Sequence, residues 1–340
     1  MLELAADLLA ALRPSAGVGR PLAVATVVGI EGSAPRGLGA SMAWDGSAVI
    51  GSVAGGCVEG AVVDVLDRVL ADAGASPGRM AAREIEFGIP DTGTEAEQAL
   101  AVGLSCGGRL RFHLAVLGPD DPARDALQRA QSGLAARVAL TADGFETNEC
   151  PGAFIDEAVV PTRLLITGAM AFSQALARAA QTLGWRVTVL DPRATFLTAE
   201  RFPGAELAVE WPPEYLAREA VALTARDVVC LLSHDDRYDA EALRSALESD
   251  AGYVGAMGSR VTDHRRRAAL RELGVDEATL KRLHSPIGLD VGAVTPEETA
   301  IAILAEVIRE REGASGVALS ATDGPIHRRR APALSSPPPG

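Results

Sequence analysis

The second half of the chain alternates short apolar runs with segments of helical periodicity. Four apolar runs have the length and composition of buried strands: residues 163–167, 186–190, 227–232 and 252–255. Helical spacing follows three of them, over residues 172–183, 239–248 and 262–273. Buried strands that alternate with helices are typical of a parallel sheet with helices on both faces. The pattern predicts a Rossmann-like parallel-sheet domain.

A further helix closes this half. Thr295 stands at the expected N-cap, Pro296 follows at the first helical position, and Glu298 completes a capping box. The spacing of the apolar residues predicts an inward stripe formed by Ile301, Leu304 and Ile308. We expect this helix to be structural.

The first half is less regular. Strands are predicted over residues 22–28, 48–53 and 110–117. Residues 58–70 have the spacing of an amphipathic helix, whose inward side consists of Val62, Val65, Leu66 and Val69. Strands and a helix together predict an α/β domain, and glycine-rich turns interrupt it.

The length of the chain suggests two domains. A single core supports roughly 250–300 residues, and the chain has 340. Residues 149–161 contain two prolines. They separate the less regular first half from the second half, in which strands and helices alternate. We expect an N-terminal α/β domain over residues 1–150 and a Rossmann-like domain over residues 160–312. Residues 313–340 are rich in Gly, Ser, Arg and Pro, and we expect them to form a flexible tail.

The composition narrows the classes of partner. The formal net charge is −13, and an acidic surface repels nucleic acids and anionic lipids, so neither is expected as a partner. The chain shows no signal-peptide pattern and no uncharged apolar run long enough for a membrane helix. Its four scattered cysteines argue against a secreted disulfide framework. These features predict a cytoplasmic protein, and they leave room for a small anion in a local basic pocket.

A glycine turn follows the first strand of the predicted Rossmann domain. In such domains glycines allow close approach of a pyrophosphate, and an acid about 20 residues later binds the ribose. Here Gly168 and Asp191 stand at two of these places, but Met170 and Ser173 replace the other two glycines. The fold signal is therefore good, and the signal for binding NAD(P) is weak.

The carboxyl ends of the predicted strands are where open parallel sheets bind ligands. The candidate side chains at these ends are Gly168, Asp191, Arg193, His234, Ser259 and Arg260. Arginines and a helix N-terminus suit a phosphate. Ordinary alternatives remain open, because Asp191 could cap a helix, Arg193 could be solvated, and His234 could be a hydrogen-bonded loop residue.

A second turn, over residues 52–60, joins a strand to a helix. It contains Gly55, Gly56, Cys57 and Glu59. A thiol in the first turn of a helix has its thiolate favoured by the helix dipole, whereas the nearby charge of Glu59 opposes that effect.

Two more features of the first half are candidates for ligand contact. Cys106 is followed by Gly107 and Gly108, and glycines let a ligand approach closely. Arg36, in a glycine-rich turn after the first strand, is a candidate anion contact or a solvated side chain. Cys57 and Cys106 could face one pocket or be small buried residues. No Cys-x-x-Cys or His-x-x-x-His pair occurs, so we expect no zinc site.

Several blocks, in order, resemble the XdhC/CoxI family of molybdoenzyme maturation factors. The blocks are Gly32-Ser33-Ala34-Pro35-Arg36, Gly51-Ser52-Val53-Ala54-Gly55-Gly56-Cys57-Val58-Glu59-Gly60, Gly103-Leu104-Ser105-Cys106-Gly107-Gly108, Tyr253-Val254-Gly255-Ala256-Met257-Gly258-Ser259-Arg260, and Ser285-Pro286-Ile287-Gly288-Leu289-Asp290-Val291-Gly292-Ala293 leading into Thr295-Pro296-Glu297-Glu298. The resemblance runs from about residue 20 to residue 312.

The resemblance implies a chaperone that binds molybdenum cofactor, protects it, and delivers it to a xanthine dehydrogenase or carbon monoxide dehydrogenase-type enzyme. It also implies contact with a cofactor-sulfurating or cytidylyltransferase protein, and a homodimer. The cofactor is a pterin with a dithiolene-bound metal and a terminal phosphate or nucleotide. Arg36, Arg193 and Arg260 are then candidate anion contacts, and Cys57 and Cys106 candidate neighbours of the metal–sulfur end.

Three functions compete on these observations. The first is a cofactor carrier without turnover of its own, which is the function we favour. The second is an NAD(P)-dependent oxidoreductase that uses the Rossmann crevice, with His234 as acid or base. The third is a thiol or sulfur-transfer protein that uses Cys57.

Overall fold

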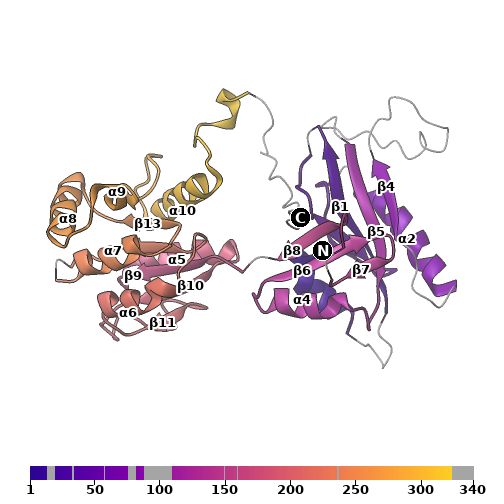
Figure 1. Cartoon of the computed structure of the whole chain (residues 1–340), viewed down its shortest axis with the longest axis horizontal. Helices are drawn as coiled ribbons and strands as arrows, with labels where there is room; N and C mark the ends of the chain where they lie inside the picture. The colour runs from indigo at the N-terminus through magenta and orange to yellow at the C-terminus, as the bar shows by residue number, and fades with distance from the viewer. Residues whose placement is uncertain are drawn as a thin grey trace, which may run out of the picture. The chain divides into compact units, whose positions relative to one another are not determined.

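A computed structural model describes residues 1–13, 20–32, 34–56, 58–75, 82–87, 109–148, 150–158, 160–235 and 237–323. The chain forms two compact units, one over Met1–Val160 and the other over Pro161–Thr322 (Figure 1). Both units combine helices with strands, and the second contains a parallel sheet. The predicted α/β class is therefore confirmed.

The second unit is built on six strands, and every neighbouring pair in the sheet runs parallel. The strands are β9 (Arg163–Thr167), β10 (Arg186–Leu190), β11 (Glu206–Ala208), β12 (Val228–Leu231), β13 (Tyr253–Ala256) and β14 (Leu283–His284). Their order in the sheet is β11-β10-β9-β12-β13-β14. The order reverses between β9 and β12, and Rossmann-type sheets bind ligands at the carboxyl ends of the strands near such a reversal.

Helices cover both faces of this sheet (Figure 1). On one face lie α5 (Ala171–Thr182) and α10 (Pro296–Glu312), and on the other α6 (Pro212–Glu219), α7 (Asp239–Glu248), α8 (Arg260–Glu272) and α9 (Glu277–Leu280). Side chains alternate along each strand, so Ile166 packs with α5 and α10 whereas Leu165 packs with the opposite helices. Short 3₁₀ turns lie at η2 (Ala220–Ala222) and η3 (Leu319–Ala321).

The capping of α10 agrees with the sequence, but its buried side does not. Glu298 N donates to Thr295 Oγ1 at 3.2 Å, and Thr295 N donates to Glu298 Oε2 at 2.9 Å, which completes the predicted capping box. The predicted stripe is wrong in two of its three members. Ile301 is 61% exposed and Ile308 37% exposed, and only Leu304 is buried. The buried side of α10 also includes Ala300, Ile303 and Val307, which pack against α5 and the sheet.

The described residues of the first unit form two antiparallel sheets. The larger has the order β3-β2-β1-β5-β4, and its strands are β1 (Leu22–Glu31), β2 (Ser41–Trp44), β3 (Val49–Gly51), β4 (Arg83–Phe87) and β5 (Arg109–Leu117). The smaller has the order β7-β6-β8, formed by β6 (Ala136–Thr141), β7 (Gly144–Glu146) and β8 (Phe154–Ala158).

Helices in this unit pack on both faces of the larger sheet. Helix α2 (Glu59–Ala75) covers one face and buries Val62, Leu66 and Val69 there, as the sequence predicts, while Val65 is partly buried. The other face packs against α1 (Ala5–Ala11), α4 (Ala123–Gln131) and the smaller sheet, and the 3₁₀ turn η1 (Leu2–Leu4) precedes α1. The larger sheet is thus the centre of this unit.

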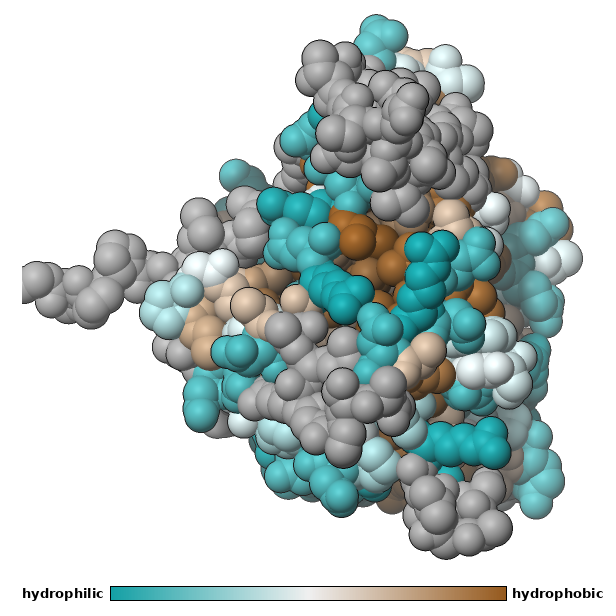
Figure 2. All heavy atoms as spheres, turned by 90° about the vertical axis from the view of Figure 1, so that its right-hand side faces the viewer, coloured by the Kyte–Doolittle hydropathy of each residue, from teal (hydrophilic) through white to brown (hydrophobic). Residues whose placement is uncertain are grey.

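Figure 2 shows a face of the first unit on which hydrophilic residues lie on either side of a small hydrophobic area near the centre. Among the described helices, none combines the length and apolar composition needed to cross a membrane.

Candidate functional site

Gly168, at the carboxyl end of β9, has a positive φ of 92°. A Cβ at this position would stand 2.9 Å from Ser233 N and 3.1 Å from Ser233 Cα. Glycine is therefore required here by the close approach of the segment that follows β12. Ser173 stands where dinucleotide-binding turns have their third glycine. It is fully buried, and its hydroxyl donates to the carbonyl oxygen of Gly168. This packing explains both residues without a pyrophosphate.

Asp191, at the carboxyl end of β10, is fully buried and engaged on both carboxylate oxygens. Ala169 N donates to Oδ2 at 2.7 Å, and Arg193 donates from Nε to Oδ1 at 2.8 Å and from Nη2 to Oδ2 at 2.7 Å. Burial alone would raise the pKa of Asp191, but these hydrogen bonds and the Arg193 charge outweigh it and lower the pKa. The acid at the ribose-binding place of a Rossmann unit thus binds its own chain.

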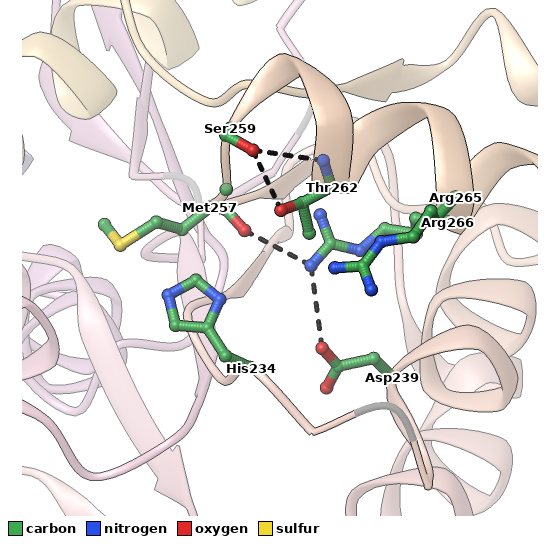
Figure 3. A pocket seen from close by; sticks show the side chains of 8 residues that line it. His234, Asp239, Met257, Ser259, Thr262, Arg265 and Arg266 are labelled. Carbon is green, nitrogen blue, oxygen red and sulfur yellow. Dashed lines mark hydrogen bonds and ion pairs between the residues drawn. The ribbon is translucent and has the colours of Figure 1, made fainter.

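A hollow of about 470 Å³ lies where the segments after β12 and β13 meet the start of α8. We call it the α8 hollow, and its lining residues are His234, Asp239, Met257, Gly258, Ser259, Thr262, Arg265 and Arg266. Figure 3 shows the two arginines on one side of the hollow and His234 on the other. Ser259 caps α8, because its Oγ accepts a hydrogen bond from Thr262 N at 3.1 Å.

Arg266 is the unusual member of this lining. Its side chain is only 4% exposed, and its Nη2 donates to Met257 O at 3.2 Å. The same nitrogen lies 3.5 Å from Asp239 Oδ2, whereas Nη1 is buried without a hydrogen-bond partner among the described residues. Nη1 lies beside Gly258, since a Cβ on that glycine would be 3.4 Å from it. A buried guanidinium nitrogen without an acceptor is costly unless a ligand or water supplies one.

Asp239, a lining residue of the hollow, fixes the backbone segment that follows β12. Its carboxylate accepts hydrogen bonds from Ser233 Oγ at 2.8 Å and from Asp235 N at 3.2 Å. Burial raises the pKa of Asp239, and Ser233 and Arg266 oppose that rise only in part. The carboxylate thus fixes the backbone after β12 and balances part of the arginine charge.

The crevice expected from sequence is only partly assembled. His234 and Ser259 line the α8 hollow, whereas Gly168, Asp191, Arg193 and Arg260 are not among its lining residues. Arg260 is exposed at the first position of α8.

Four residues of the lining were not predicted from the sequence: Asp239, Thr262, Arg265 and Arg266. A signal for Arg266 was present, because it follows the N-cap Ser259 by seven residues. That spacing is two helical turns and places both residues on one side of α8.

The Gly55–Gly56 turn of the first unit is organised by Glu59. Its Oε1 accepts from Ala54 N and Ser52 Oγ, both at 2.8 Å, and its Oε2 accepts from Gly56 N at 2.8 Å and Val58 N at 3.2 Å. Burial alone would raise the pKa of Glu59, but the hydrogen bonds outweigh it and lower the pKa to about 2. The carboxylate is therefore ionised at neutral pH and fixes the residues on both sides of position 57.

Arg36 is held within the first unit. Its Nη1 donates to Ser52 O at 2.5 Å and its Nη2 donates to Glu3 Oε2 at 2.7 Å. It lines a second hollow, of about 410 Å³, together with the acidic residues Glu3, Asp156 and Glu157. The arginine expected to contact an anion thus pairs with Glu3 and shares its hollow with two further carboxylates.

The cysteine turns are described only in part. Cys57, Cys106, Gly107 and Gly108 lie outside the described residues. Within the described ranges no group of three or more His, Cys, Asp or Glu residues could hold a metal ion.

The segment after β14 is anchored on Glu306 of α10. Glu306 Oε2 accepts from Tyr253 Oη at 2.6 Å and from Gly288 N at 2.7 Å, and His284 Nδ1 lies 3.4 Å from Oε1. Burial alone would raise the pKa of Glu306, but His284, Tyr253 and Gly288 outweigh it and lower the pKa to about 2. The His284 ring also stacks on Tyr253 at 4.4 Å. The contacts of this segment are those of a structural anchor.

Comparison with known families gives two matches. Residues 16–80 match the family described as XdhC and CoxI, and residues 164–307 match the XdhC Rossmann domain. Together the matches cover more than half of the chain.

Three curated relatives are similar over most of the chain. A Bacillus subtilis (strain 168) protein, whose name describes it as a probable subunit of xanthine dehydrogenase, is 25% identical over 324 residues, which cover 85% of this chain and 93% of that protein. The molybdenum cofactor insertion chaperone PaoD of Escherichia coli (strain K12) is 27% identical over 313 residues, covering 86% and 84%. YqeB of the same organism is 26% identical over 300 residues; these cover 87% of this chain but only 44% of YqeB.

A solved structure has the same fold. It is described as a xanthine dehydrogenase from Bacillus halodurans, and it superimposes with a TM-score of 0.70 over 94% of this chain and 97% of its own. Its sequence is 24% identical.

Proposed function

Because the chain belongs to the XdhC and CoxI family, we propose that it binds molybdenum cofactor and delivers it to a molybdoenzyme of the xanthine dehydrogenase type. The name of the relative PaoD, a molybdenum cofactor insertion chaperone, supports this proposal, as does the xanthine dehydrogenase name of the Bacillus subtilis relative. The cofactor is then the cargo of the protein.

The Gly55–Gly56 turn is the observation that carries the proposal. Both glycines have positive φ, of 70° and 113°, both are exposed, and a Cβ at either would meet no heavy atom within 4 Å. Such a turn leaves open backbone beside position 57, where a large flat pterin can approach closely. We place the metal–sulfur end of the cofactor here, with Cys57 and Cys106 as its neighbours, since soft sulfur side chains suit such groups.

The contacts of Glu59 favour a role of this turn in protecting the cofactor over a role in thiol chemistry. The amides of Gly56 and Val58 at the start of α2 already bind this carboxylate, so they are not available to stabilise a thiolate or an oxyanion. The fixed negative charge of Glu59 further disfavours a thiolate nearby. The turn is therefore shaped in advance for binding and poorly suited to a reactive nucleophile.

The contacts of Asp191 support carriage over nicotinamide chemistry. A ribose hydroxyl would have to displace Arg193 or Ala169 N from this carboxylate, and both contacts are shorter than 3 Å. Met170 also stands, half-exposed, at the place of the second glycine. We infer that the second unit does not hold NAD(P) in the manner of a dehydrogenase.

A transfer assay tests delivery. Purified protein is loaded with molybdenum cofactor, freed of unbound cofactor, and mixed with a cofactor-free xanthine dehydrogenase in air. We expect more dehydrogenase activity than from the same amount of free cofactor, because the bound cofactor is shielded from oxidation. Equal dehydrogenase activity from free cofactor and from cofactor bound to this protein would contradict the proposal.

A matched pair of variants locates the site. Gly56→Val places a branched side chain in the open turn, and Gly60→Ala adds a methyl group one helical turn away, where nothing lies within 4 Å. We expect Gly56→Val to reduce delivery and Gly60→Ala to retain it. Far-UV circular dichroism of both variants checks that each is folded.

A further inference from the structure

We propose that the α8 hollow in the second unit binds the phosphate group of a phosphate monoester. This goes beyond cofactor delivery, because the site uses residues of the second unit alone and would serve any small ligand that ends in a phosphate.

Arg266 is the first reason. Its side chain is almost fully buried, yet its Nη1 has no acceptor among the described residues. Arg266 lines the hollow, and its buried Nη1 lies beside Gly258, another lining residue just before α8. A phosphate oxygen there would receive a charge-assisted hydrogen bond, which is stronger than one between neutral groups.

The start of α8 is the second reason. This helix has 13 residues, and its N-terminus carries the positive end of the helix dipole. Of the amides in its first turn, Thr262 N is bound to Ser259 Oγ. Ser259 and Thr262 line the hollow, and their hydroxyls share one hydrogen bond at 3.0 Å, so one of the two keeps its hydrogen to donate to a phosphate oxygen.

The balance of charge is the third reason. Two arginines, Arg265 and Arg266, line the hollow with one acid, Asp239. Asp239 faces Arg266 Nη2 at 3.5 Å and turns its other contacts toward Ser233 and the Asp235 amide. The lining therefore keeps an excess of positive charge, in a chain whose net charge is −13. A local basic site of this kind selects an anion.

The size of the hollow indicates an ester. Its volume of about 470 Å³ lies within the range of small-molecule pockets, which are roughly 300–1,000 Å³, and exceeds what a phosphate ion fills. His234 and Met257 provide a surface against which the organic part of the ligand can pack. A nucleoside monophosphate and the phosphate of a pterin cofactor share this chemistry.

Titration calorimetry on the full-length protein tests the proposal. The probes are CMP, AMP, inorganic phosphate and molybdopterin released from a donor enzyme, with cytidine and adenosine as phosphate-free controls. We expect at least one phosphate ester to bind, and the two nucleosides not to bind. Absence of binding by every phosphate probe would overturn the proposal.

Variants locate the binding. Arg265→Gln removes an exposed charge of the lining, and Arg271→Gln removes the same charge from the last turn of α8, outside the hollow. We expect Arg265→Gln to weaken binding about ten-fold, as the loss of one charge-assisted hydrogen bond implies, and Arg271→Gln to change it less than about two-fold. Equal losses in the two variants would overturn the assignment to the hollow.

Arg266→Lys tests the buried guanidinium itself and keeps a cation opposite Asp239. We expect a loss of affinity of at least about ten-fold in a variant with unchanged circular dichroism. If Arg266→Lys unfolds, Arg265→Gln decides the question.

Competition between the probes distinguishes the two sources of phosphate. Displacement of a bound nucleotide by molybdopterin assigns the site to the cofactor. Binding of nucleotide to the cofactor-loaded protein assigns it to a separate ligand.

Discussion

Arg193 and Asp191 form a two-point ion pair at the carboxyl end of β10, with Nε 2.8 Å from Oδ1 and Nη2 2.7 Å from Oδ2. Arg193 also lies over the Phe196 ring, 4.7 Å from its centroid. The pair places a structural contact where dehydrogenases of this fold keep a free acid for the ribose. Asp191 therefore stabilises the turn after β9, through Ala169, in place of contacting a nucleotide.

The first prediction concerns Asp191→Asn. The amide cannot form the ion pair, and its nitrogen faces donors, so we expect the free energy of unfolding to fall by about 2–3 kcal/mol at pH 7. The pKa of Asp191 is lowered in the folded state, so its contribution is present at neutral pH and is lost as the pH falls through that lowered pKa. Urea unfolding at several pH values measures this, with the exposed Asp250→Asn as control. Unchanged stability together with lost NAD⁺ binding would indicate a ribose-binding acid.

The second prediction compares two glycines of positive φ. Gly168→Ala drives a Cβ to 2.9 Å from Ser233 N, whereas Gly184→Ala, at φ 72°, meets nothing within 4 Å. Backbone strain of about 1 kcal/mol applies to both, and Gly168→Ala adds a steric cost of about 1–3 kcal/mol. Urea midpoints of the two variants measure the difference. Equal destabilisation would show that Ser233 does not require glycine at position 168.

The third prediction concerns Glu59→Gln. Loss of the carboxylate leaves backbone amides of the turn with a weaker acceptor, so we expect destabilisation of about 1–3 kcal/mol at pH 7. The pKa of Glu59 is about 2 in the folded state, and its ordinary value is 4.5. The difference in the free energy of unfolding between wild type and Glu59→Gln is therefore complete above about pH 4.5 and declines toward pH 2. Glu31→Gln, exposed at the end of β1, is the control. A constant difference between Glu59→Gln and wild type from pH 7 to pH 2 would refute a role for this charge.

The fourth prediction concerns Glu306→Gln. The side chain holds Tyr253 and Gly288 on one oxygen, so we expect a loss of about 2–3 kcal/mol, against less than 1 kcal/mol for Glu297→Gln in an exposed ion pair on the same helix. Because the folded-state pKa of Glu306 is about 2, its contribution also declines as the pH falls below about 4.5. Thermal unfolding followed by near-ultraviolet circular dichroism measures both variants. A smaller loss in Glu306→Gln than in Glu297→Gln would contradict the anchoring role.

The second half was predictable because its signals are local. The strand predicted over residues 163–167 and the helix predicted over residues 239–248 coincide with β9 and α7. A parallel sheet buried on both faces produces continuous apolar runs, which periodicity detects. The helix α10 shows the limit, because Ile301 and Ile308 fit a helical stripe as well as Ile303 and Val307 do, and only the packing partners decide which side is buried.

The first half was harder because its sheets depend on distant pairings. Strand β1 pairs with β5 over separations from 78 residues (Glu31 with Arg109) to 95 residues (Leu22 with Leu117), and the short strands β6, β7 and β8 carry weak signals. The site was harder still. Sequence places Asp191 and His234 at strand ends, but cannot show that Asp191 is bound by Arg193 or that the α8 hollow is lined by Arg266 instead.

Retention of molybdenum cofactor tests the central claim most directly. The purified protein is incubated with cofactor released from a donor enzyme, unbound cofactor is removed by rapid ultrafiltration, and molybdenum and pterin are quantified in the retained fraction. We predict near-equimolar retention by the wild-type protein and by Gly60→Ala, and reduced retention by Gly56→Val. Retention by the wild-type protein no greater than that of an albumin control would contradict the account.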